Sequence, residues 1–417
     1  MNVFIITVGS RGDIQPFIAL GKGLQAAGHT VAVCTAEGYR AWVEEHGLTY
    51  AHMNNEFLEL LTSQDAKTAT DSGGGMKFLQ QAMRVVRRSF DDQWASARAF
   101  QPDVIVYHPK ALGGLHIAEK LSIPVFLSIP LPLFTPTRAF PTPIMPDLKL
   151  GGAVNRLSYR MMGLVSAPYA GVINDFRVNV LGLPKRGRFA PEIVKTSGEP
   201  MPILYPFSRH VVPVPADYPA HAHVTGYWFL DQSGTWQPPH ALARFLNEGT
   251  PPVYVGFGSM SGANAATRAQ IVLEALAQAG QRGVIASGWG GLKPDQVGDD
   301  VFLVDAVPHD WLFPHMGAVV HHGGSGTTAM GLNAGKPTVI VPFLADQPFW
   351  GRRVAELGVG PAPIPQKKLT VAALAGAITA AATDEAMRQR AAALGTAIRA
   401  EDGVARAIAI IEAAGRG

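Results

Sequence analysis

Short apolar runs alternate with helix-like segments along the first part of the chain. Val3 to Val8 is followed by a glycine-rich turn, and apolar positions then recur at helical spacing from about Pro16 to Ala27. Gly28 stands where a helix would end, and Thr30 to Thr35 is the next apolar run. This order predicts a βαβ unit, and such units build parallel sheets with right-handed crossovers.

The same alternation continues until a proline-rich stretch interrupts it. Pro102 to Tyr107 and Val125 to Ser128 are predicted strands, with a helix over Leu112 to Leu121 between them. No periodicity is visible from Ile129 to Pro146. Because this stretch is too apolar for a disordered tail, its length favours a functional loop.

A second series of strands and helices begins at Pro252. Its predicted strands are Val253 to Phe257, Val284 to Ser287, Val301 to Val304, Ala318 to His321 and Thr338 to Pro342. We therefore expect an α/β protein with two doubly wound, Rossmann-like domains that face each other across a cleft. The expected domains are residues 1–230 and 252–417, joined by a linker over residues 231–251, and the last helix is able to pack back on the first domain.

Charge excludes one class of partner. The net charge of +3 over 417 residues is close to neutral, whereas nucleic-acid binding usually requires a concentrated basic face. The most basic segment is Lys77 to Arg98, where arginines follow helical spacing among apolar residues. A solvated helix face is the favoured interpretation, and a weak contact with a membrane surface is the alternative.

The cysteine content and the apolar runs indicate a compartment. The single cysteine, Cys34, cannot form an intramolecular disulfide, which favours a reducing environment. The first residues pass directly into an apolar strand without a basic segment, and no apolar run reaches the roughly 18 residues of a membrane span. We expect a cytoplasmic protein.

The strongest chemical motif is His321 to Thr328, which follows a predicted strand and opens a helix. The first turn of a helix has backbone N–H groups without helical partners, and the helix dipole adds partial positive charge. Glycines allow a ligand to approach the backbone, so the segment suits a diphosphate, to which His322 can donate a hydrogen bond. A capped helix after a tight turn is the less favoured interpretation. For His321, the alternative interpretation is that it is only the last residue of the strand and faces inward.

A second motif, Gly9 to Pro16, contains an aspartate after the first strand. Ligands of open α/β sheets bind at the carboxyl ends of the strands, so Asp13 is placed to accept a proton from an attacking hydroxyl. An ordinary aspartate, with a pKa of about 3.9, is a weak base. Asp13 is equally suited to be the N-cap of a helix that begins near Pro16.

Other motifs are weaker or absent. Asp346 and Gln347 follow an apolar strand, where a carboxylate and an amide can bind sugar hydroxyls, although this dipeptide before a proline is also an ordinary turn. The glycine turn at Gly256 to Met260 lacks the features of a dinucleotide fingerprint. The sequence has neither a DxD pair of aspartates for a divalent cation nor a cysteine–histidine spacing for zinc, so no metal and no cofactor are expected.

Together these motifs resemble the GT-B glycosyltransferases of family 1, and within them the sterol 3-beta-glucosyltransferases. The resemblance covers most of the chain in order. It includes Gly9 to Pro16, Thr137 to Pro141, Val224 to Asp231, Pro251 to Met260, Pro308 to Pro314, His322 to Thr328 and Pro342 to Gly351. It implies metal-independent, inverting transfer of a hexose, usually glucose, from UDP-glucose as co-substrate to a hydroxyl of an apolar acceptor.

The resemblance also implies roles for residues. Asp13 matches the general base. The donor-contacting positions are matched by Ser10, Arg11, Ser259, Val307, His309, His322, Ser325, Gly326, Thr327, Asp346 and Gln347. Within that set, His322 to Thr327 match the diphosphate site, and Asp346 with Gln347 match the residues that bind glucose hydroxyls.

The acceptor is defined less closely. The apolar, proline-rich segment carries Phe134 and Phe140 and suits a preformed pocket for a polycyclic alcohol such as a sterol. His108, just after another strand, is a further acceptor-side candidate and the next candidate for the base. Glycosylation of a flavonoid, macrolide, glycopeptide or other lipid, with another nucleotide sugar, is the nearest alternative. A UDP-sugar epimerase or hydrolase and a binding module without catalysis are the others.

Overall fold

The computed structural model describes residues 1–62, 75–190, 193–232, 234, 236–258, 265–287 and 297–415. It divides into two compact units. The first unit contains Met1–Phe207, Val214–Leu230 and Asp402–Gly417, and the second contains Ser208–Pro213 and Asp231–Glu401. The segment expected to be a linker, residues 231–251, belongs to the second unit and includes the helix α10 (His240–Asn247).

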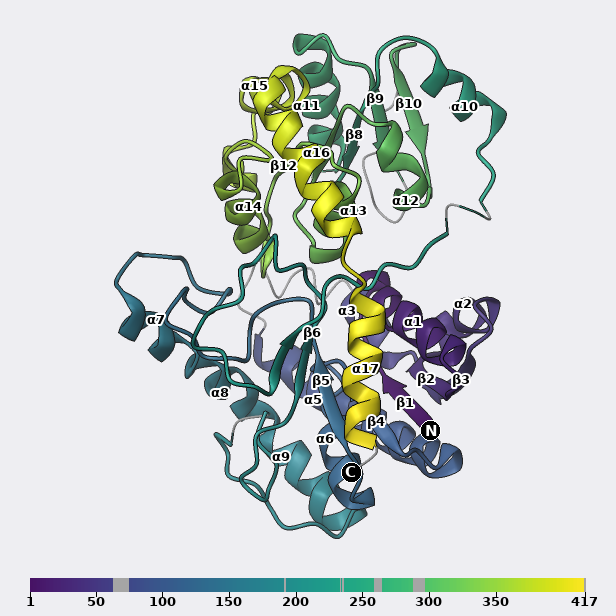
Figure 1. Cartoon of the computed structure of the whole chain (residues 1–417), viewed down its shortest axis with the longest axis vertical. Helices are drawn as coiled ribbons and strands as arrows, with labels where there is room; N and C mark the ends of the chain where they lie inside the picture. Colours follow the sequence, from purple (N-terminus) through teal and green to yellow (C-terminus); the bar gives the residue numbers. More distant parts are fainter. Residues whose placement is uncertain are drawn as a thin grey trace. The chain divides into compact units, whose positions relative to one another are not determined.

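The first unit is built on a sheet whose seven described strands are all parallel. The strands are β1 (Asn2–Ile6), β2 (Thr30–Ala36), β3 (Thr49–Met53), β4 (Val104–Tyr107), β5 (Val125–Ser128), β6 (Ile203–Tyr205) and β7 (Ala222–Val224). Their order is β3-β2-β1-β4-β5-β6-β7, and Figure 1 labels the first six strands, β1 to β6. The chain therefore changes direction across the sheet between β1 and β4, where doubly wound folds bind their ligands.

Helices surround this sheet. They are α1 (Arg11–Ala26), α2 (Arg40–Glu45), α3 (Glu56–Thr62), α5 (Gly75–Phe100), α6 (Gly114–Leu121), α7 (Gly152–Ser158), α8 (Met161–Ser166), α9 (Ala170–Asp175) and α17 (Gly403–Gly415). The predicted start of the first helix near Pro16 is wrong, because α1 begins at Arg11 and contains Pro16. Ser10 and Asp13 cap this earlier start, which places Asp13 in the first turn.

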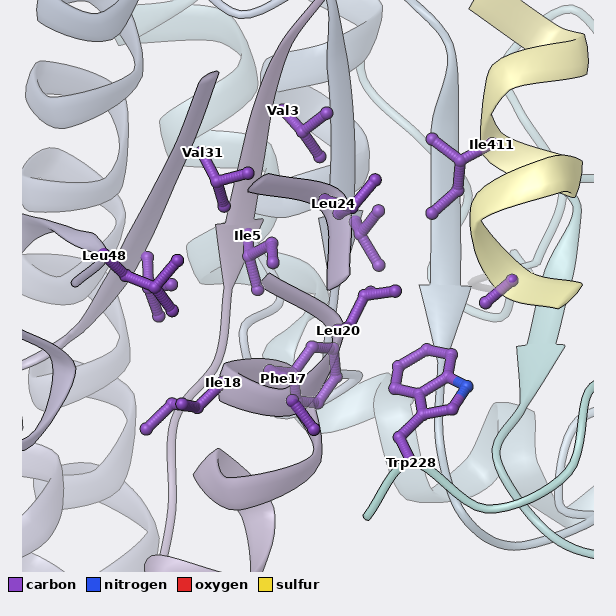
Figure 2. Packing of buried hydrophobic residues seen from close by; sticks show 14 of the residues in the cluster. Val3, Ile5, Phe17, Ile18, Leu20, Leu24, Val31, Leu48, Trp228 and Ile411 are labelled. Carbon is purple, nitrogen blue, oxygen red and sulfur yellow. The ribbon is translucent and has the colours of Figure 1, made fainter. Parts of the chain in front are cut away.

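The core of the first unit joins α1, the central strands and the last helix. Figure 2 shows Val3, Ile5, Phe17, Trp228 and Ile411 among its buried side chains. The indole N–H of Trp228 donates hydrogen bonds to Thr225 Oγ1 and to the carbonyl oxygen of Gly403, which fixes the start of α17. α17 thus completes the core of the first unit, although more than 170 residues separate it from Leu230, where the preceding part of that unit ends.

The second unit has a smaller sheet of the same kind. Its five described strands are parallel, in the order β10-β9-β8-β11-β12. They are β8 (Val253–Gly256), β9 (Gly283–Ala286), β10 (Val301–Val304), β11 (Ala318–His321) and β12 (Thr338–Ile340). The order in which the chain adds strands to this sheet reverses between β8 and β11. The expected α/β class with two Rossmann-like units is confirmed.

The helices of the second unit contribute to its core and to its ligand-facing loops. Besides α10 they are α11 (Ala265–Gln278), α12 (His309–Leu312), α13 (Ser325–Asn333), α14 (Gln347–Glu356), α15 (Val371–Thr383) and α16 (Glu385–Arg399). Aliphatic residues of α11 and α15 pack with those of β8 and β11. None of the helices in the described ranges is long and apolar enough to cross a bilayer.

Candidate active site

Asp13 lies at the carboxyl end of β1, in the first turn of α1. Its Oδ2 accepts hydrogen bonds from the backbone N–H of Ser10 (2.8 Å) and from Ser10 Oγ (3.0 Å). Thr7 Oγ1 donates to the backbone carbonyl of Asp13 at 2.8 Å. These bonds fix the carboxylate, whose side chain remains 19% exposed.

Two residues that follow β4 converge on this carboxylate. Lys110 Nζ lies 2.8 Å from Asp13 Oδ1 and 2.9 Å from Oδ2. His108 is buried, and its Nε2 lies 3.6 Å from Asp13 Oδ1. Because β1 and β4 are neighbours in the sheet, the loops after them meet at the point where the strand order reverses.

The charges of this group follow from burial and proximity. Burial by itself raises the pKa of Asp13, but Lys110, His108 and the Ser10 hydrogen bonds lower that pKa by more, so it lies below its ordinary value. Burial lowers the pKa of His108 to about 4, although the Asp13 carboxylate opposes the shift. At neutral pH the site therefore holds a carboxylate, an ammonium and a neutral imidazole.

Backbone contacts define which imidazole nitrogen faces the carboxylate. The backbone N–H of Lys110 donates to His108 Nδ1 at 3.2 Å, so Nδ1 is the acceptor and Nε2 carries the proton. The Nε2 proton is directed toward Asp13, at a separation longer than an ordinary hydrogen bond. His108 is thus a neighbour of the candidate base, in a position that supports the carboxylate.

Gly9 makes room for Asp13. A Cβ atom on Gly9 would lie 2.2 Å from Asp13 Oδ2, which is inside any allowed contact. The residue also has a φ of +138°, a conformation that side chains other than glycine rarely adopt. The loop conformation and the position of the carboxylate therefore both require glycine here.

Arg11, a predicted donor contact, is directed toward α2. Its guanidinium lies 4.5 Å from the centre of the Trp42 ring, as in a cation–π pair. Ser10, the other predicted contact in this loop, uses both its backbone N–H and its hydroxyl on Asp13. The structure thus places Ser10 against Asp13 and Arg11 against Trp42, while the donor-binding roles of both residues remain predictions.

The second unit carries the predicted diphosphate site at the start of α13. Gly324 precedes this helix in an extended conformation, and Ser325, Gly326 and Thr327 form its first turn. The backbone N–H groups of this turn have no acceptor within the helix. This is the arrangement in which a helix start binds phosphate.

The His322 ring packs against the glycines on both sides of this site. A Cβ atom on Gly324 would lie 2.6 Å from His322 Nε2, and one on Gly258 would lie 3.6 Å from its Cε1. β8 and β11 are adjacent, so the loops that follow them meet as those of the first unit do. Ser259, predicted to approach the diphosphate from this side, lies outside the described residues.

Both histidines of the motif are neutral. Burial lowers the pKa of His322 to about 4, and it lowers the pKa of His321 well below its ordinary value. The backbone N–H of Gly323 donates to His321 Nδ1 at 2.9 Å, and His321 is fully buried. Among the described residues, His322 Nδ1 and His321 Nε2 are buried without a hydrogen-bond partner, and the contact of His322 with a diphosphate remains a prediction.

The predicted sugar-binding pair stands at the start of α14. Gln347 is buried, and its Oε1 accepts hydrogen bonds from the backbone N–H groups of Phe343 and Leu344. Asp346 Oδ2 accepts a bond from Trp350 Nε1 at 2.9 Å. Ala345 has a φ of +58°, a strained conformation of the kind concentrated at binding sites. The structure therefore gives this pair a role in shaping the loop, and its contact with glucose remains a prediction.

The predicted nucleoside contacts surround α12. Val307 lies half-buried in the loop before this helix. The His309 ring stacks on Phe313 with their centroids 4.3 Å apart, and Tyr254 OH lies 3.3 Å from His309 Nε2. These contacts hold the imidazole in one orientation next to the loop that follows β10.

The predicted acceptor segment is tied to other parts of the first unit. Thr135 Oγ1 and Tyr205 OH form a hydrogen bond of 2.7 Å. Asp217 accepts bonds from Thr137 Oγ1 (2.5 Å) and from the backbone N–H of Arg138 (2.9 Å). Phe134 and Phe140 within this segment are half-buried. The segment is irregular but anchored, as a preformed pocket requires.

Sequence reasoning missed Lys110 and Asp217. Lys110 lies three residues after the end of β4, close to His108, which was predicted as a site residue. A charged residue at the end of a strand was therefore a signal that could have identified it. For Asp217 no local pattern points to the loop it anchors. Across the described residues, no group of histidine, cysteine, aspartate and glutamate side chains is arranged to hold a metal ion.

Two family models match this chain. Residues 3–141 match the N-terminal domain of glycosyltransferase family 28. Residues 256–410 match the C-terminal domain of proteins similar to erythromycin biosynthesis protein CIII. The two matches fall on the candidate sites of the first and the second unit.

Curated relatives extend the similarity along the whole chain. The sterol 3-beta-glucosyltransferases of Aspergillus fumigatus and Emericella nidulans are 38% and 39% identical to it over 99% of its length. That of Cryptococcus neoformans is 37% identical, again over 99%. The chain spans about 30% of the first two relatives and 27% of the third.

Solved structures show the same fold. The glycosyltransferase of kitacinnamycin has a TM-score of 0.75 at 20% identity, covering 99% of this chain and 98% of its own. The calicheamicin glycosyltransferase CalG4 has a TM-score of 0.68 at 19% identity, with coverage of 99% and 98%. The chain therefore combines a glycosyltransferase family 28 N-terminal domain with an erythromycin CIII-like C-terminal domain in the GT-B fold, and its sequence is similar to that of the sterol 3-beta-glucosyltransferases.

Proposed function

We propose that the chain transfers glucose from UDP-glucose to the hydroxyl of a sterol, with inversion at the anomeric carbon. The observation that carries this proposal is the identity of 37–39% to sterol 3-beta-glucosyltransferases over 99% of the chain. The two candidate sites support it, since one offers a carboxylate base and the other a helix start suited to a diphosphate.

In the proposed reaction Asp13 is the general base. The acceptor oxygen attacks the anomeric carbon, the bond from that carbon to the UDP oxygen breaks, and UDP leaves with the electron pair. The hydroxyl proton passes to Asp13. Because the pKa of Asp13 is low, proton transfer is expected late, when the new bond has already made the hydroxyl acidic.

Lys110 has a positioning role in this proposal. Its ammonium holds both carboxylate oxygens and thereby keeps Asp13 ionised at the pH of the reaction. The side chain is 45% exposed, so solvent can replace the ion pair when an acceptor hydroxyl approaches. Lys110 therefore sets both the ionisation of the base and the access to it.

No metal is part of the proposed reaction. The charge that develops on the diphosphate is met by the N–H groups of Ser325, Gly326 and Thr327 and by a proton on His322. His322 has one proton when neutral, and a bound diphosphate favours a second by its charge. Arg11 is close to Asp13 in sequence and can turn from Trp42 toward an anion.

The test is an assay of the purified chain with UDP-glucose and cholesterol dispersed in cyclodextrin, with and without EDTA. We expect a glucoside of the sterol by mass spectrometry, with the β-anomer by NMR, and no loss in EDTA. Asp13→Asn keeps the size of the side chain and should lower turnover by about a hundredfold or more. Release of free glucose without a glucoside would instead identify a hydrolase. Normal turnover of Asp13→Asn would instead make His108 the candidate for the general base.

A further inference from the structure

Large apolar side chains are concentrated in one exposed stretch of the first unit. Of the fourteen large hydrophobic residues exposed in the part of the chain that the structure describes, eight lie within residues 144–165. They are Ile144, Leu148, Leu150, Val154, Leu157, Met161, Leu164 and Val165, and we call them the α7–α8 apolar surface. Isolated apolar residues are ordinary on a protein surface, but such a concentration marks an interaction site.

The local structure explains why these residues are not covered. α7 and α8 are short helices at the edge of the first unit (Figure 1). Leu148 and Leu164 are 62% and 63% exposed, while Ser158, the last residue of α7, and Tyr159, which follows it, are buried. The helices thus use few residues to attach to the unit and present the remaining apolar residues outward. Phe189, 60% exposed, adjoins Gly163 of α8 and extends the surface.

Basic residues are interspersed with the apolar ones. Arg156 and Arg160 are exposed within the stretch, and Lys149 is exposed as well but forms an ion pair with Asp147, the one acidic residue of the stretch. Arg188 is exposed as well, with its guanidinium 5.9 Å from the Phe189 ring. Apolar side chains combined with lysine and arginine are the pattern by which peripheral proteins bind anionic lipid surfaces.

Two arginines of the other basic segment, α5, are paired with carboxylates. On α5, Arg87 forms ion pairs with Asp91 and Asp175, and Arg88 forms one with Glu56. Their charges are already balanced by carboxylates of the protein, as expected for a solvated helix face. The positive charge beside exposed apolar residues is at α7 and α8.

We propose that the α7–α8 apolar surface binds the surface of a lipid bilayer that contains anionic lipids. The surface begins at Ile144, inside the anchored segment proposed to bind the acceptor (residues 129–146), and continues directly after it in sequence. A bilayer bound there would place a membrane-dissolved acceptor next to that segment. This last step rests on the proposed function, whereas the binding of lipid does not.

The test is co-sedimentation of the whole chain with vesicles. One set contains phosphatidylcholine alone, and the other contains phosphatidylcholine with phosphatidylglycerol. The variant Leu148→Ser/Leu157→Ser/Leu164→Ser removes three exposed apolar residues that are not part of the proposed active site. The control Val178→Ser/Val214→Ser/Val297→Ser removes three exposed apolar residues outside the surface.

We expect the wild-type chain and the control to bind the anionic vesicles, with weaker binding at high salt. The affinity of the leucine variant for these vesicles should be lower by a factor of about ten or more. Its transfer to cyclodextrin-dispersed sterol should be unchanged, which separates this result from a failure of the proposed function. Absence of wild-type binding, or equal losses in variant and control, would overturn the proposal. A wild-type dimer that the leucine variant dissociates, without vesicle binding, would assign the surface to a second copy.

Discussion

At Asp13, two opposing electrostatic effects act on one carboxyl group. Burial favours the neutral acid, while Lys110, His108 and Ser10 favour the carboxylate and prevail. The ion pair is partly exposed, so it contributes little to stability and its main effect is on ionisation. A substitution of Lys110 can therefore change the pKa of Asp13 without altering Asp13 itself.

Lys110→Met should raise the pKa of Asp13, because it removes the nearest positive charge. Asp13 acts as a base only when ionised, so activity falls as pH drops through its pKa. The acidic limb of the kcat profile should therefore move to higher pH, by about one unit. Lys120→Met on α6 is the matched control and should leave the profile in place. An unshifted limb in Lys110→Met would remove the ion pair from the proposed mechanism.

His322→Ala should weaken the binding of UDP as well as that of UDP-glucose. The buried Nδ1 without a partner and the adjacent helix start indicate that the imidazole binds a phosphate group common to both ligands. We expect about a tenfold loss, the effect of one hydrogen bond to a charged group, measured by calorimetry. Unchanged UDP affinity would show that the imidazole serves only to pack against Gly258 and Gly324.

At the scale of elements, close approach between helices depends on single glycines. α1 and α17 touch at Gly23, where a Cβ atom would lie 2.3 Å from Val404 Cγ1. The same contact places Ile411 of α17 beside the residues of α1 in Figure 2. The attachment of the last helix to the first unit is thus sensitive to a change of one carbon atom.

Gly23→Ala should destabilise the first unit by about 1–3 kcal/mol, since the added methyl group overpacks the contact with Val404. Gly171→Ala on α9 is the control, because a Cβ atom there would meet open space. The control should be neutral or more stable by up to about 1 kcal/mol. Urea unfolding curves measure both, and equal stability of the two variants would contradict the close contact.

Elements were predictable from sequence where local patterns determine them. Val3 to Val8 and Thr30 to Thr35 were recognised because buried parallel strands are continuous apolar runs. The start of α1 was placed too late because Pro16 suggested a first turn, whereas the Ser10 and Asp13 cap was decisive. Lys110 lies 97 residues from Asp13, and only the pairing of β1 with β4 brings them together. Strand order is a tertiary property that the spacing of residues does not reveal.

At the scale of the whole molecule, several buried histidines are neutral. Burial lowers the pKa values of His108, His116 and His322 to about 4, and it lowers the pKa of His321 well below its ordinary value. In the unfolded chain the same groups bind protons near pH 6.5. Between these values the unfolded state therefore holds more protons than the folded state, and the free energy of unfolding decreases as pH falls.

The free energy of unfolding should fall between about pH 7 and about pH 5, by roughly 2 kcal/mol for each such histidine. Urea unfolding at the two pH values measures this loss. His116→Gln is the informative variant, since it lies outside both candidate sites and removes one titrating group. The decrease in the free energy of unfolding of this variant between the two pH values should be smaller than that of the wild type by the contribution of one histidine. An equal loss in both proteins would show that His116 does not contribute.

The path of the chain between the units has a consequence for protein engineering. Apart from the short segment Ser208–Pro213, the second unit is inserted between Leu230 and Asp402, and α17 returns to complete the core of the first unit. A fragment that stops before Asp402 would leave the first unit without Ala407 and Ile411, which are fully buried there. A chimera that exchanges residues 231–401 between relatives therefore needs two junctions, one near residue 230 and one near residue 402, and it must also keep the exchanged part compatible with Ser208–Pro213.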